Sequence, residues 1–296
     1  PGVELMENLR TDPGEEANDP SFVGRLVAGQ DCYVNDAFGS SHRAHASIVG
    51  PPSRLPSAAG RLLAREVEVI GGLLDDPKHP FVAVLGGAKV ADKIGVVRSL
   101  ADKADTVLVG GGMSYTFLKA TGHEIGSSML DESRIDDCKQ LLEQKANIVL
   151  PDDIVGIGPG GTLHPGAGDV EDGDPIETFY GDIADGFEGV DIGPATRKRF
   201  SDVIATAGTV FWNGPLGLFE DPRFAKGTLA VAQSVVACRG FTVVGGGDIV
   251  AALDAFGLAD GIGFVSTGGG ASLELIEYGD LPGLLALREA PNAPAK

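Results

Sequence analysis

Two lysines that follow a glycine pair are the residues in this chain best suited to bind a phosphate. The apolar run 81–85 ends at Gly86-Gly87, which predicts a buried strand that runs into a tight turn. Helical spacing follows, and a helix beginning near Val90 would bring the ammonium groups of Lys89 and Lys93 to one side of its first turn. Because a helix N-terminus is already electropositive, two added lysines favour an external anion such as a phosphate. The alternative is a solvated lysine face that is partly paired with neighbouring aspartates.

Three further stretches carry oxygen or N–H groups suited to a nucleotide. Asp248 lies at a glycine turn into a predicted helix, where it would either bind Mg²⁺ held by nucleotide phosphates or cap the helix. The stretch 267–272 places a run of backbone N–H groups at the start of a helix, which predicts an oxyanion cradle. The stretch 213–220 ends in Glu220, whose carboxylate could reach a ribose hydroxyl, whereas Trp212 and Phe219 are predicted to be core residues.

A second cationic spot lies nearer the N-terminus. His42, Arg43 and His45 fall within four consecutive positions of an otherwise acidic chain. They predict an anion site, with a surface loop carrying incidental histidines as the alternative.

The elements that must position these residues are read from apolar runs and the glycines that end them. The runs occupy residues 81–85, 106–109, 147–150, 209–212, 241–244 and 263–265. Glycine turns stand at Gly86-Gly87, Gly110-Gly-Gly112, Gly193-Pro194, Asn213-Gly-Pro215, Gly245-Gly-Gly247 and Thr267-Gly-Gly-Gly270. Helical segments fit between most runs, so we predict βαβ units and a parallel sheet covered on both faces. Ligands of such sheets bind at the carboxyl ends of the strands, where glycine lets the backbone approach a phosphate or a base.

The rest of the chain gives a coarser prediction. The N-terminal part is predicted to contain a short strand at 3–6, a loop at 11–20, a helix at 22–27 and a strand at 31–36. A proline-bounded helix over 58–74, which could stop at Ile70, is a candidate connector between domains. The stretch 156–175, rich in Gly, Pro and Asp, is predicted to be a loop or an irregular β excursion.

Composition limits the class of protein. A formal net charge of −19 disfavours binding to nucleic acid or to an acidic membrane surface. The cysteines are 3 in number and have no CxxC spacing, which argues against a disulfide framework or a zinc site and fits a reducing compartment. No apolar run approaches the roughly 18 residues of a membrane span, and no signal peptide is evident, so we expect a cytoplasmic protein.

The sequence lacks two other common nucleotide-binding motifs. The stretch 245–250 half resembles GxGxxG, but Val250 occupies the third glycine position and no acidic residue ends a second strand about 20 positions on. A Walker A loop is excluded because the sequence has no Gly-Lys dipeptide. A dehydrogenase of the Rossmann type is therefore the weakest alternative.

Eight motifs, in this order, resemble those of the phosphoglycerate kinase family. They are Glu7-Asn-Leu-Arg10, Asn35-Asp-Ala-Phe-Gly39 with His42-Arg-Ala-His45, Leu85-Gly-Gly-Ala-Lys-Val90 with Asp92-Lys93, Gly110-Gly-Gly-Met113, Asp191-Ile-Gly-Pro194, Trp212-Asn-Gly-Pro215, Gly245-Gly-Gly-Asp248 and Ser266-Thr-Gly-Gly-Gly-Ala-Ser272. The resemblance implies an α/β protein with two doubly wound, Rossmann-like domains of parallel sheet joined by a hinge helix. It also implies reversible phosphoryl transfer between 1,3-bisphosphoglycerate and MgADP, giving 3-phosphoglycerate and ATP in glycolysis, by a monomer.

The resemblance further implies domain bounds and residue roles. It implies a partial 3-phosphoglycerate domain at 1–57, a hinge at 58–77, a nucleotide domain at 78–275 and a returning segment at 276–296. Arg10, His42 and Arg43 would hold the glycerate phosphate. Catalytic roles would fall to Lys89, Lys93, Gly268, Gly269 and Gly270. Nucleotide binding would involve Gly87, Ala88, Lys89, Lys93, Gly111, Gly112, Gly193, Asn213, Pro215, Glu220, Gly246, Gly247, Asp248 and Ile249, with Asp248 as the ligand of Mg²⁺.

Two departures from the family pattern leave an alternative open. The family normally carries about a hundred residues, much of a domain, before the Glu7 to Arg10 motif, and we expect the glycerate pocket to be incomplete without them. Ile249 stands where the family usually has Thr or Ser, and the loss of a hydroxyl donor to a phosphate would weaken binding by about 1–3 kcal/mol. The alternative is a non-catalytic or impaired relative that keeps the fold and nucleotide binding.

Overall fold

The computed structural model describes residues 2–166 and 173–291. It divides into two compact units. The terminal unit runs up to Gly72 and resumes at Thr267, and the central unit is Leu73–Ser266. Within the described ranges, no helix combines the length and the apolar character needed to cross a bilayer.

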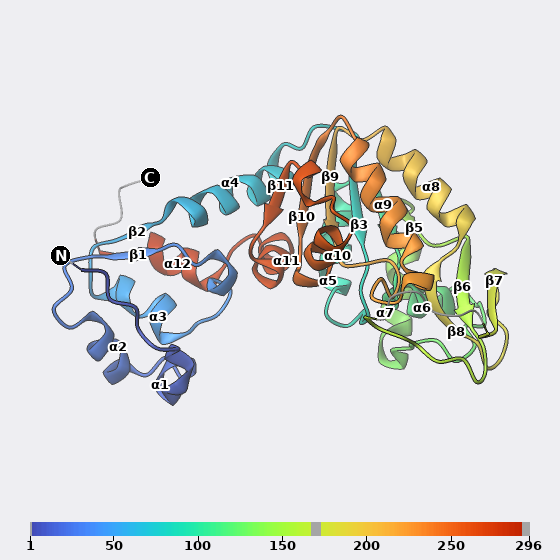
Figure 1. Cartoon of the computed structure of the whole chain (residues 1–296). Helices are drawn as coiled ribbons and strands as arrows, with labels where there is room; N and C mark the ends of the chain where they lie inside the picture. Colours follow the sequence, from blue (N-terminus) through green and yellow to red (C-terminus); the bar gives the residue numbers. More distant parts are fainter. Residues whose placement is uncertain (1, 167–172, 292–296) are drawn as a thin grey trace. The chain divides into compact units, whose positions relative to one another are not determined.

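The main sheet of the central unit has, among the described residues, six parallel strands in the order β11-β10-β9-β3-β4-β5 (Figure 1). The strands are β3 (Phe81–Leu85), β4 (Thr106–Val109), β5 (Ile148–Val149), β9 (Thr209–Asn213), β10 (Phe241–Gly245) and β11 (Phe264–Ser266). Each lies on one of the predicted apolar runs, so the predicted α/β class with a parallel sheet is confirmed. Because all neighbours are parallel, the carboxyl ends of these strands share one edge of the sheet.

Helices cover both faces of this sheet. On one face, Val82 and Val84 of β3 pack in a fully buried cluster with side chains of three helices, α8 (Pro194–Ala205), α9 (Lys226–Ala237) and α10 (Gly247–Ala255). The alternate residues of β3 are also buried, and α5 contacts both β3 and β4, as expected for a strand covered on two sides. The remaining helices of this unit are α5 (Ile94–Lys103), α6 (Met113–Ala120), α7 (Ile135–Gln144), η4 (Glu132–Arg134), η5 (Pro222–Phe224) and η6 (Ala259–Gly261).

A second, antiparallel sheet in the central unit was not predicted. It has the order β7-β6-β8 and consists of β6 (Asp153–Ile157), β7 (Ile176–Tyr180) and β8 (Glu188–Ile192). The stretch 156–175 was predicted to be a loop or an irregular β excursion; its first two residues belong to β6, which agrees with the second alternative, and residues 167–172 lie outside the described residues. The pairing of β6 with β8 is irregular between Val155 and Gly156, and all five residues of β6 are buried, so the strand shows no alternation of apolar and polar residues.

The terminal unit contains a parallel strand pair and several short helices. The pair joins β1 (Tyr33–Asn35) to β2 (Ser57–Ala59). The helices are α1 (Pro13–Glu16), α2 (Pro20–Val27), α3 (Ala46–Val49), α11 (Gly269–Tyr278), α12 (Pro282–Arg288), η1 (Leu9–Thr11), η2 (Phe38–Ser40) and η3 (Pro51–Ser53). The predicted helix at 22–27 and strand within 31–36 are confirmed.

Three predictions for the N-terminal part are corrected. Residues 3–6 form no strand, because Val3 and Leu5 are almost fully exposed and no neighbouring strand pairs with them. The expected loop at 11–20 contains α1, whose first turn Asp12 caps by accepting from the Gly14 N–H at 2.8 Å. The connector helix is α4 (Arg61–Asp75), preceded by β2 instead of beginning at 58.

The connector helix also continues past its glycine pair. Gly71-Gly72 lies inside α4, although each glycine disfavours a helix by about 1 kcal/mol. Val69, Ile70 and Leu73 are all buried. Because burying side chains of this kind contributes about 1.5–3 kcal/mol each, packing outweighs the local preference to stop at Ile70.

Candidate functional site

Glycine-rich loops follow β3, β4, β9 and β10 and pack against one another at the shared edge of the main sheet. The Gly86 N–H donates to the Asn213 carbonyl at 2.9 Å, and the Gly87 N–H donates to the Pro215 carbonyl at 2.8 Å. A Cβ on Gly86 would come within 2.1 Å of the Pro215 carbonyl oxygen. Several of these glycines therefore serve loop packing directly, in addition to any contact with a ligand.

Positive φ angles explain why the turn residues themselves are glycine. Gly87, Gly111, Gly214 and Gly246 have φ of 101°, 65°, 87° and 120°. Side chains disfavour this half of conformational space, so glycine is needed at each turn. These glycines make short loops with little side-chain bulk at the ends of the strands.

Lys93 is the cation held most firmly at this edge. It precedes α5, which begins at Ile94 and not near Val90 as predicted. Its Nζ donates to the Gly86 carbonyl at 2.6 Å. Burial lowers the pKa of Lys93 to about 8, and the negative charges of Asp248 and Asp92 act in the opposite direction. Lys93 and Asp248 therefore interact electrostatically.

Lys89 and Asp248 are more exposed to solvent than Lys93. Lys89 is exposed in the loop between β3 and α5. Asp248 is exposed in the first turn of α10, and the helix N-cap is Gly246. Asp248 therefore does not serve as the N-cap, and its carboxylate is available to a ligand.

A cavity of about 320 Å³ opens beside these loops, wholly within the central unit. Its wall includes the predicted nucleotide-binding residues Gly87, Ala88, Gly111, Gly112, Pro215, Glu220 and Asp248. The rest of the wall comes from residues that the sequence reasoning missed, which are Tyr115, Met129, Leu163, Glu188, Gly189, Val190, Gly217 and Leu218. The wall thus combines bare backbone with apolar side chains, and it has carboxylates at Glu188, Glu220 and Asp248.

Besides Lys89, Lys93, Gly246 and Gly247, three predicted nucleotide-binding residues lie outside this wall. Gly193 ends β8 of the antiparallel sheet, where it is buried against Asp153. Asn213 is buried, and its Nδ2 donates to the Gly245 carbonyl, which joins the ends of β9 and β10. The side chain of Ile249 is fully buried in the apolar cluster under α10. The Ile249 side chain therefore offers no donor to a phosphate, as its apolar character indicated, and a contact at this position would come from the backbone N–H.

Gly246 and Gly247 shape the entry to α10. Gly246 is the N-cap of the helix and Gly247 is its first residue, with open space where a Cβ would stand. These two residues leave the N–H groups of the first turn accessible, which suits an anion.

The remaining predicted residues lie in the terminal unit. Gly268 packs against the Phe38 ring, where an added Cβ would approach to 2.4 Å. A Cβ on Gly270 would come within 3.5 Å of the His42 Nε2 atom, so His42 and the start of α11 are brought together. Burial is the main cause that lowers the pKa of His42. Arg10 and Arg43 are exposed, Arg10 in η1 and Arg43 in the loop before α3.

A buried glutamate of α4 anchors the loop that carries these glycines. Glu66 is 1% exposed, and its Oε1 accepts from the Thr267 N–H at 2.7 Å and from the Thr267 hydroxyl at 2.8 Å. The sequence reasoning missed Glu66, although a glutamate among the apolar positions of a helix is a usable signal. Gly269 begins α11 directly after this anchored turn.

Comparison with known proteins decides the family. Residues 2–278 match the family described as "Phosphoglycerate kinase". The chain belongs to the phosphoglycerate kinase family. It is 49% identical over 291 residues to a phosphoglycerate kinase of Thermus thermophilus, covering 96% of this chain and 72% of that protein. It is 47% identical over 292 residues to that of Roseiflexus sp. strain RS-1, covering 97% and 72%.

Solved structures agree with this assignment. Phosphoglycerate kinase from Coxiella burnetii superposes with a TM-score of 0.85 at 37% identity, over 95% of this chain and 72% of that one. The chain therefore has the activity of a phosphoglycerate kinase, a phosphotransferase of glycolysis that uses a nucleotide and phosphoglycerate. The alternative of a non-catalytic relative is not favoured.

Proposed function

We propose that the cavity of the central unit binds the nucleotide of the phosphoglycerate kinase reaction, with its phosphates toward Lys93 and Asp248. The observation that carries this proposal is the juxtaposition of a half-buried ammonium and an exposed carboxylate at the edge of a cavity walled by glycine backbone. Gly87, Ala88, Gly111 and Gly112 leave room for the flat adenine ring.

The remaining nucleotide contacts are proposed from position. Glu220 lies on the cavity wall and would accept from a ribose hydroxyl. Pro215 shapes the wall, while Asn213 holds the strand ends that carry it. Gly193 follows β8 and is not on the cavity wall, so we assign its predicted role at the base to Gly189, the glycine of β8 that is on the wall.

Asp248 fits a magnesium ion that is shared with the nucleotide. Mg²⁺ prefers oxygen ligands, and it often uses one carboxylate together with phosphate oxygens and waters. A carboxylate in the first helical turn would otherwise repel the phosphates that the N–H groups of Gly247 and Ile249 could bind. When bound, Mg²⁺ would supply charge neutralisation to the phosphates.

The chain's own residues would supply positioning and further charge neutralisation. Phosphoryl transfer needs no covalent nucleophile from the protein and depends mainly on aligned reactants and on cations at the transferring oxygens. Lys93 would neutralise charge on the nucleotide phosphates, and exposed Lys89 would do so from the solvent side. The N–H groups of Gly268, Gly269 and Gly270 would bind the transferred group.

For the second substrate, we propose that Arg10, His42 and Arg43 bind the phosphate of 3-phosphoglycerate or 1,3-bisphosphoglycerate. In this proposal residues 1–57 belong to the phosphoglycerate domain, 58–77 form the hinge, 78–275 form the nucleotide domain and 276–296 return to the first. Because the reacting atoms must approach to about 3–3.5 Å, the hinge would allow the two domains to close.

We further infer a monomeric cytoplasmic enzyme without nucleic-acid or membrane partners. The net charge of −19 supports this inference because anionic polymers and surfaces would be repelled.

Calorimetric titration of the chain with ADP, with and without Mg²⁺, tests the nucleotide and metal assignments. We expect saturable binding that is tighter with Mg²⁺, and we expect Asp248→Asn to remove the Mg²⁺ advantage. Asp254→Asn, at the other end of α10, is the matched control. Binding that Asp248→Asn leaves equally sensitive to Mg²⁺ would overturn the metal assignment. A coupled assay of ATP formation tests turnover.

A further inference from the structure

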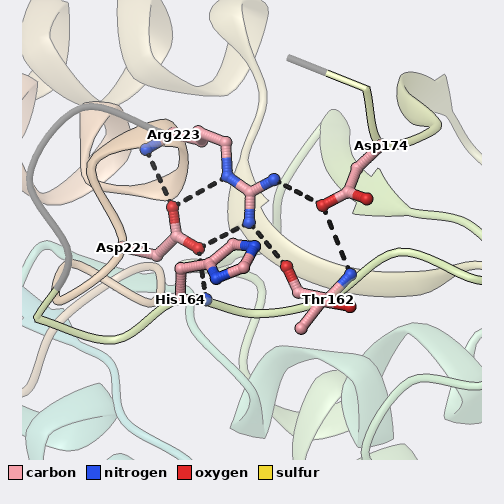
Figure 2. A network of polar contacts seen from close by, with 5 residues as sticks. All are labelled: Thr162, His164, Asp174, Asp221 and Arg223. Carbon is pink, nitrogen blue, oxygen red and sulfur yellow. Dashed lines mark hydrogen bonds and ion pairs between the residues drawn. The ribbon is translucent and has the colours of Figure 1, made fainter. Parts of the chain in front are cut away.

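A compact ionic cluster (Figure 2) is formed by residues next in sequence to two residues of the cavity wall, Leu163 and Glu220. The Arg223 side chain is 9% exposed, and its guanidinium lies between two carboxylates. Its Nε and Nη2 donate to Oδ1 and Oδ2 of Asp221 at 3.0 and 2.7 Å, a bidentate pair. Its Nη1 donates to Asp174 Oδ2 at 2.7 Å. Such paired, charge-assisted bonds fix geometry as well as adding energy.

The same cluster holds the backbone on both sides of Leu163. Arg223 Nη2 donates to the Thr162 carbonyl at 2.8 Å, and the His164 N–H donates to Asp221 Oδ2 at 2.9 Å. Leu163, between these two anchors, lines the cavity. The Asp174 carboxylate also accepts from the Thr162 N–H at 3.3 Å.

The other wall residue is Glu220, which directly precedes Asp221. Its carbonyl accepts from the Gly166 N–H at 2.9 Å, so the stretch that carries Leu163 is bonded to the stretch that carries Glu220 at a further point. The Arg223 guanidinium also makes a cation–π contact with the fully buried Phe224 ring, whose centroid is 4.9 Å away.

Electrostatics make this arrangement stiff. The Asp221 side chain is 0% exposed, and its bonds to Arg223 are the main cause that lowers its pKa to about 2. A carboxylate that is buried and ionised in this way needs its partner, since removing the partner leaves an uncompensated charge. The loop geometry near Leu163 therefore depends on Arg223 and not on Leu163 alone.

We propose that Arg223 is a positioning residue for the adenosine part of the nucleotide, acting by holding Leu163 and Glu220 in the cavity wall. This inference rests on the proposed nucleotide site. Arg223 is not itself on the cavity wall, and Lys93 and Asp248, where the phosphates are placed, take no part in the cluster. Its loss should weaken contacts to adenosine and spare contacts to phosphate.

Titration of the full chain with MgADP and with magnesium pyrophosphate, which lacks adenosine, separates these effects. Arg223→Lys keeps a charge but cannot reproduce the fork of donors, and we expect it to raise the Kd for MgADP about tenfold and to change that for pyrophosphate less than twofold. In the coupled assay, KM for MgADP should rise while kcat stays within about twofold. Arg199→Ala is the control, because Arg199 pairs with Asp152 at 2.6 Å on the exposed side of α8.

A milder variant keeps the test decisive if Arg223→Lys folds poorly. Asp174→Ala leaves the Asp221–Arg223 pair intact and removes the second carboxylate, so we expect a smaller rise in Kd, about threefold, again confined to MgADP. An unchanged Kd for MgADP in a variant with a native circular dichroism spectrum would overturn the inference. Equal weakening of both ligands would also overturn it, because it would indicate a general structural role. Failure of the unmodified chain to bind MgADP would instead overturn the nucleotide site and this inference with it.

Discussion

The position of Lys93 predicts that nucleotide affinity falls as the pH is raised from 7 to 9. With a pKa of about 8, the free protein carries the ammonium form in about nine molecules of ten at pH 7 and in about one of ten at pH 9. If the phosphates bind only the ammonium form, the Kd for MgADP rises about tenfold across this interval. Affinity falls as the pH rises because burial lowers the pKa of Lys93 in the free protein toward neutrality. A bound phosphate would raise that pKa again, so binding favours the ammonium form.

The assay is calorimetric titration with MgADP at pH 7, 8 and 9, in pairs of buffers that differ in ionisation enthalpy. Above pH 8 we expect binding to take up close to one proton, which the buffer comparison measures. Lys93→Met should bind more weakly and lose the tenfold change. Lys93→Arg should show a flat profile, because a guanidinium stays charged throughout.

Lys89→Met is the matched control. It removes one positive charge from the same loop but leaves Lys93 in place, so it should weaken binding and retain the pH dependence. Titration of the nucleotide itself is common to all variants and cancels in the comparison. The reasoning is refuted if Lys93→Met and the unmodified chain lose affinity in parallel between pH 7 and 9.

Two further substitutions test the fold around the site. Gly111→Ala should lower the free energy of unfolding by roughly 2–4 kcal/mol and the thermal midpoint by several degrees. The reason is that φ at Gly111 is 65° and the new Cβ would lie 2.8 Å from the Gly87 nitrogen. Gly257→Ala is the control and should shift the midpoint much less, because φ there is 67° but the Cβ would enter open space. Burial raises the pKa of Asp191 from 3.8 to about 8, so the folded state retains a proton that the unfolded state loses, and stability should fall between about pH 4 and pH 8. Asp191→Asn should flatten that slope in differential scanning calorimetry, and an unchanged slope would contradict this role for Asp191.

The main sheet was predictable because its signal is local. Each strand is a short apolar run ended by glycine, and burial on both faces requires such runs. The antiparallel sheet escaped because β7 is half exposed and because Asp153, Gly156 and Asp191 lie inside its other two strands. A buried aspartate in a strand can be explained only when its hydrogen-bond partners are known. For Asp153 one such partner is the Thr196 N–H, which donates to its carboxylate at 2.8 Å.

The site was predictable to the extent that its residues lie at strand ends. The rule that ligands bind at glycine turns found Gly87, Gly111 and Asp248, which line one cavity. Gly193, which follows β8, was predicted as a glycine turn and given a nucleotide role by the family resemblance, whereas the wall residue Gly189 was missed. Gly189 lies within β8, next to Tyr115, and nothing in the local sequence distinguishes it from a glycine needed for packing.

The placement of Ile249 changes how the departure from the family pattern is understood. From the sequence, an apolar residue beside Asp248 suggested a missing donor to phosphate. In the structure its side chain belongs to the core cluster beneath α10, so the substitution adds apolar burial at the very turn that presents the N–H groups. A β-branched apolar residue is restricted in χ1 and packs firmly. In this position the buried side chain packs the start of α10 against the core.

The acidity of the whole chain makes this local rigidity important. With a net charge of −19, a polyphosphate is repelled at long range, and screening over about 8–10 Å at ordinary ionic strength reduces but does not reverse that repulsion. Attraction must then come from groups in contact with the ligand, at positions from which water is partly excluded. Lys93 meets this condition because its ammonium is held by the Gly86 carbonyl within the loops. A lysine that was free to move into solvent would contribute much less to phosphate binding. The glycine turns therefore hold a charge in place as well as shaping the cavity.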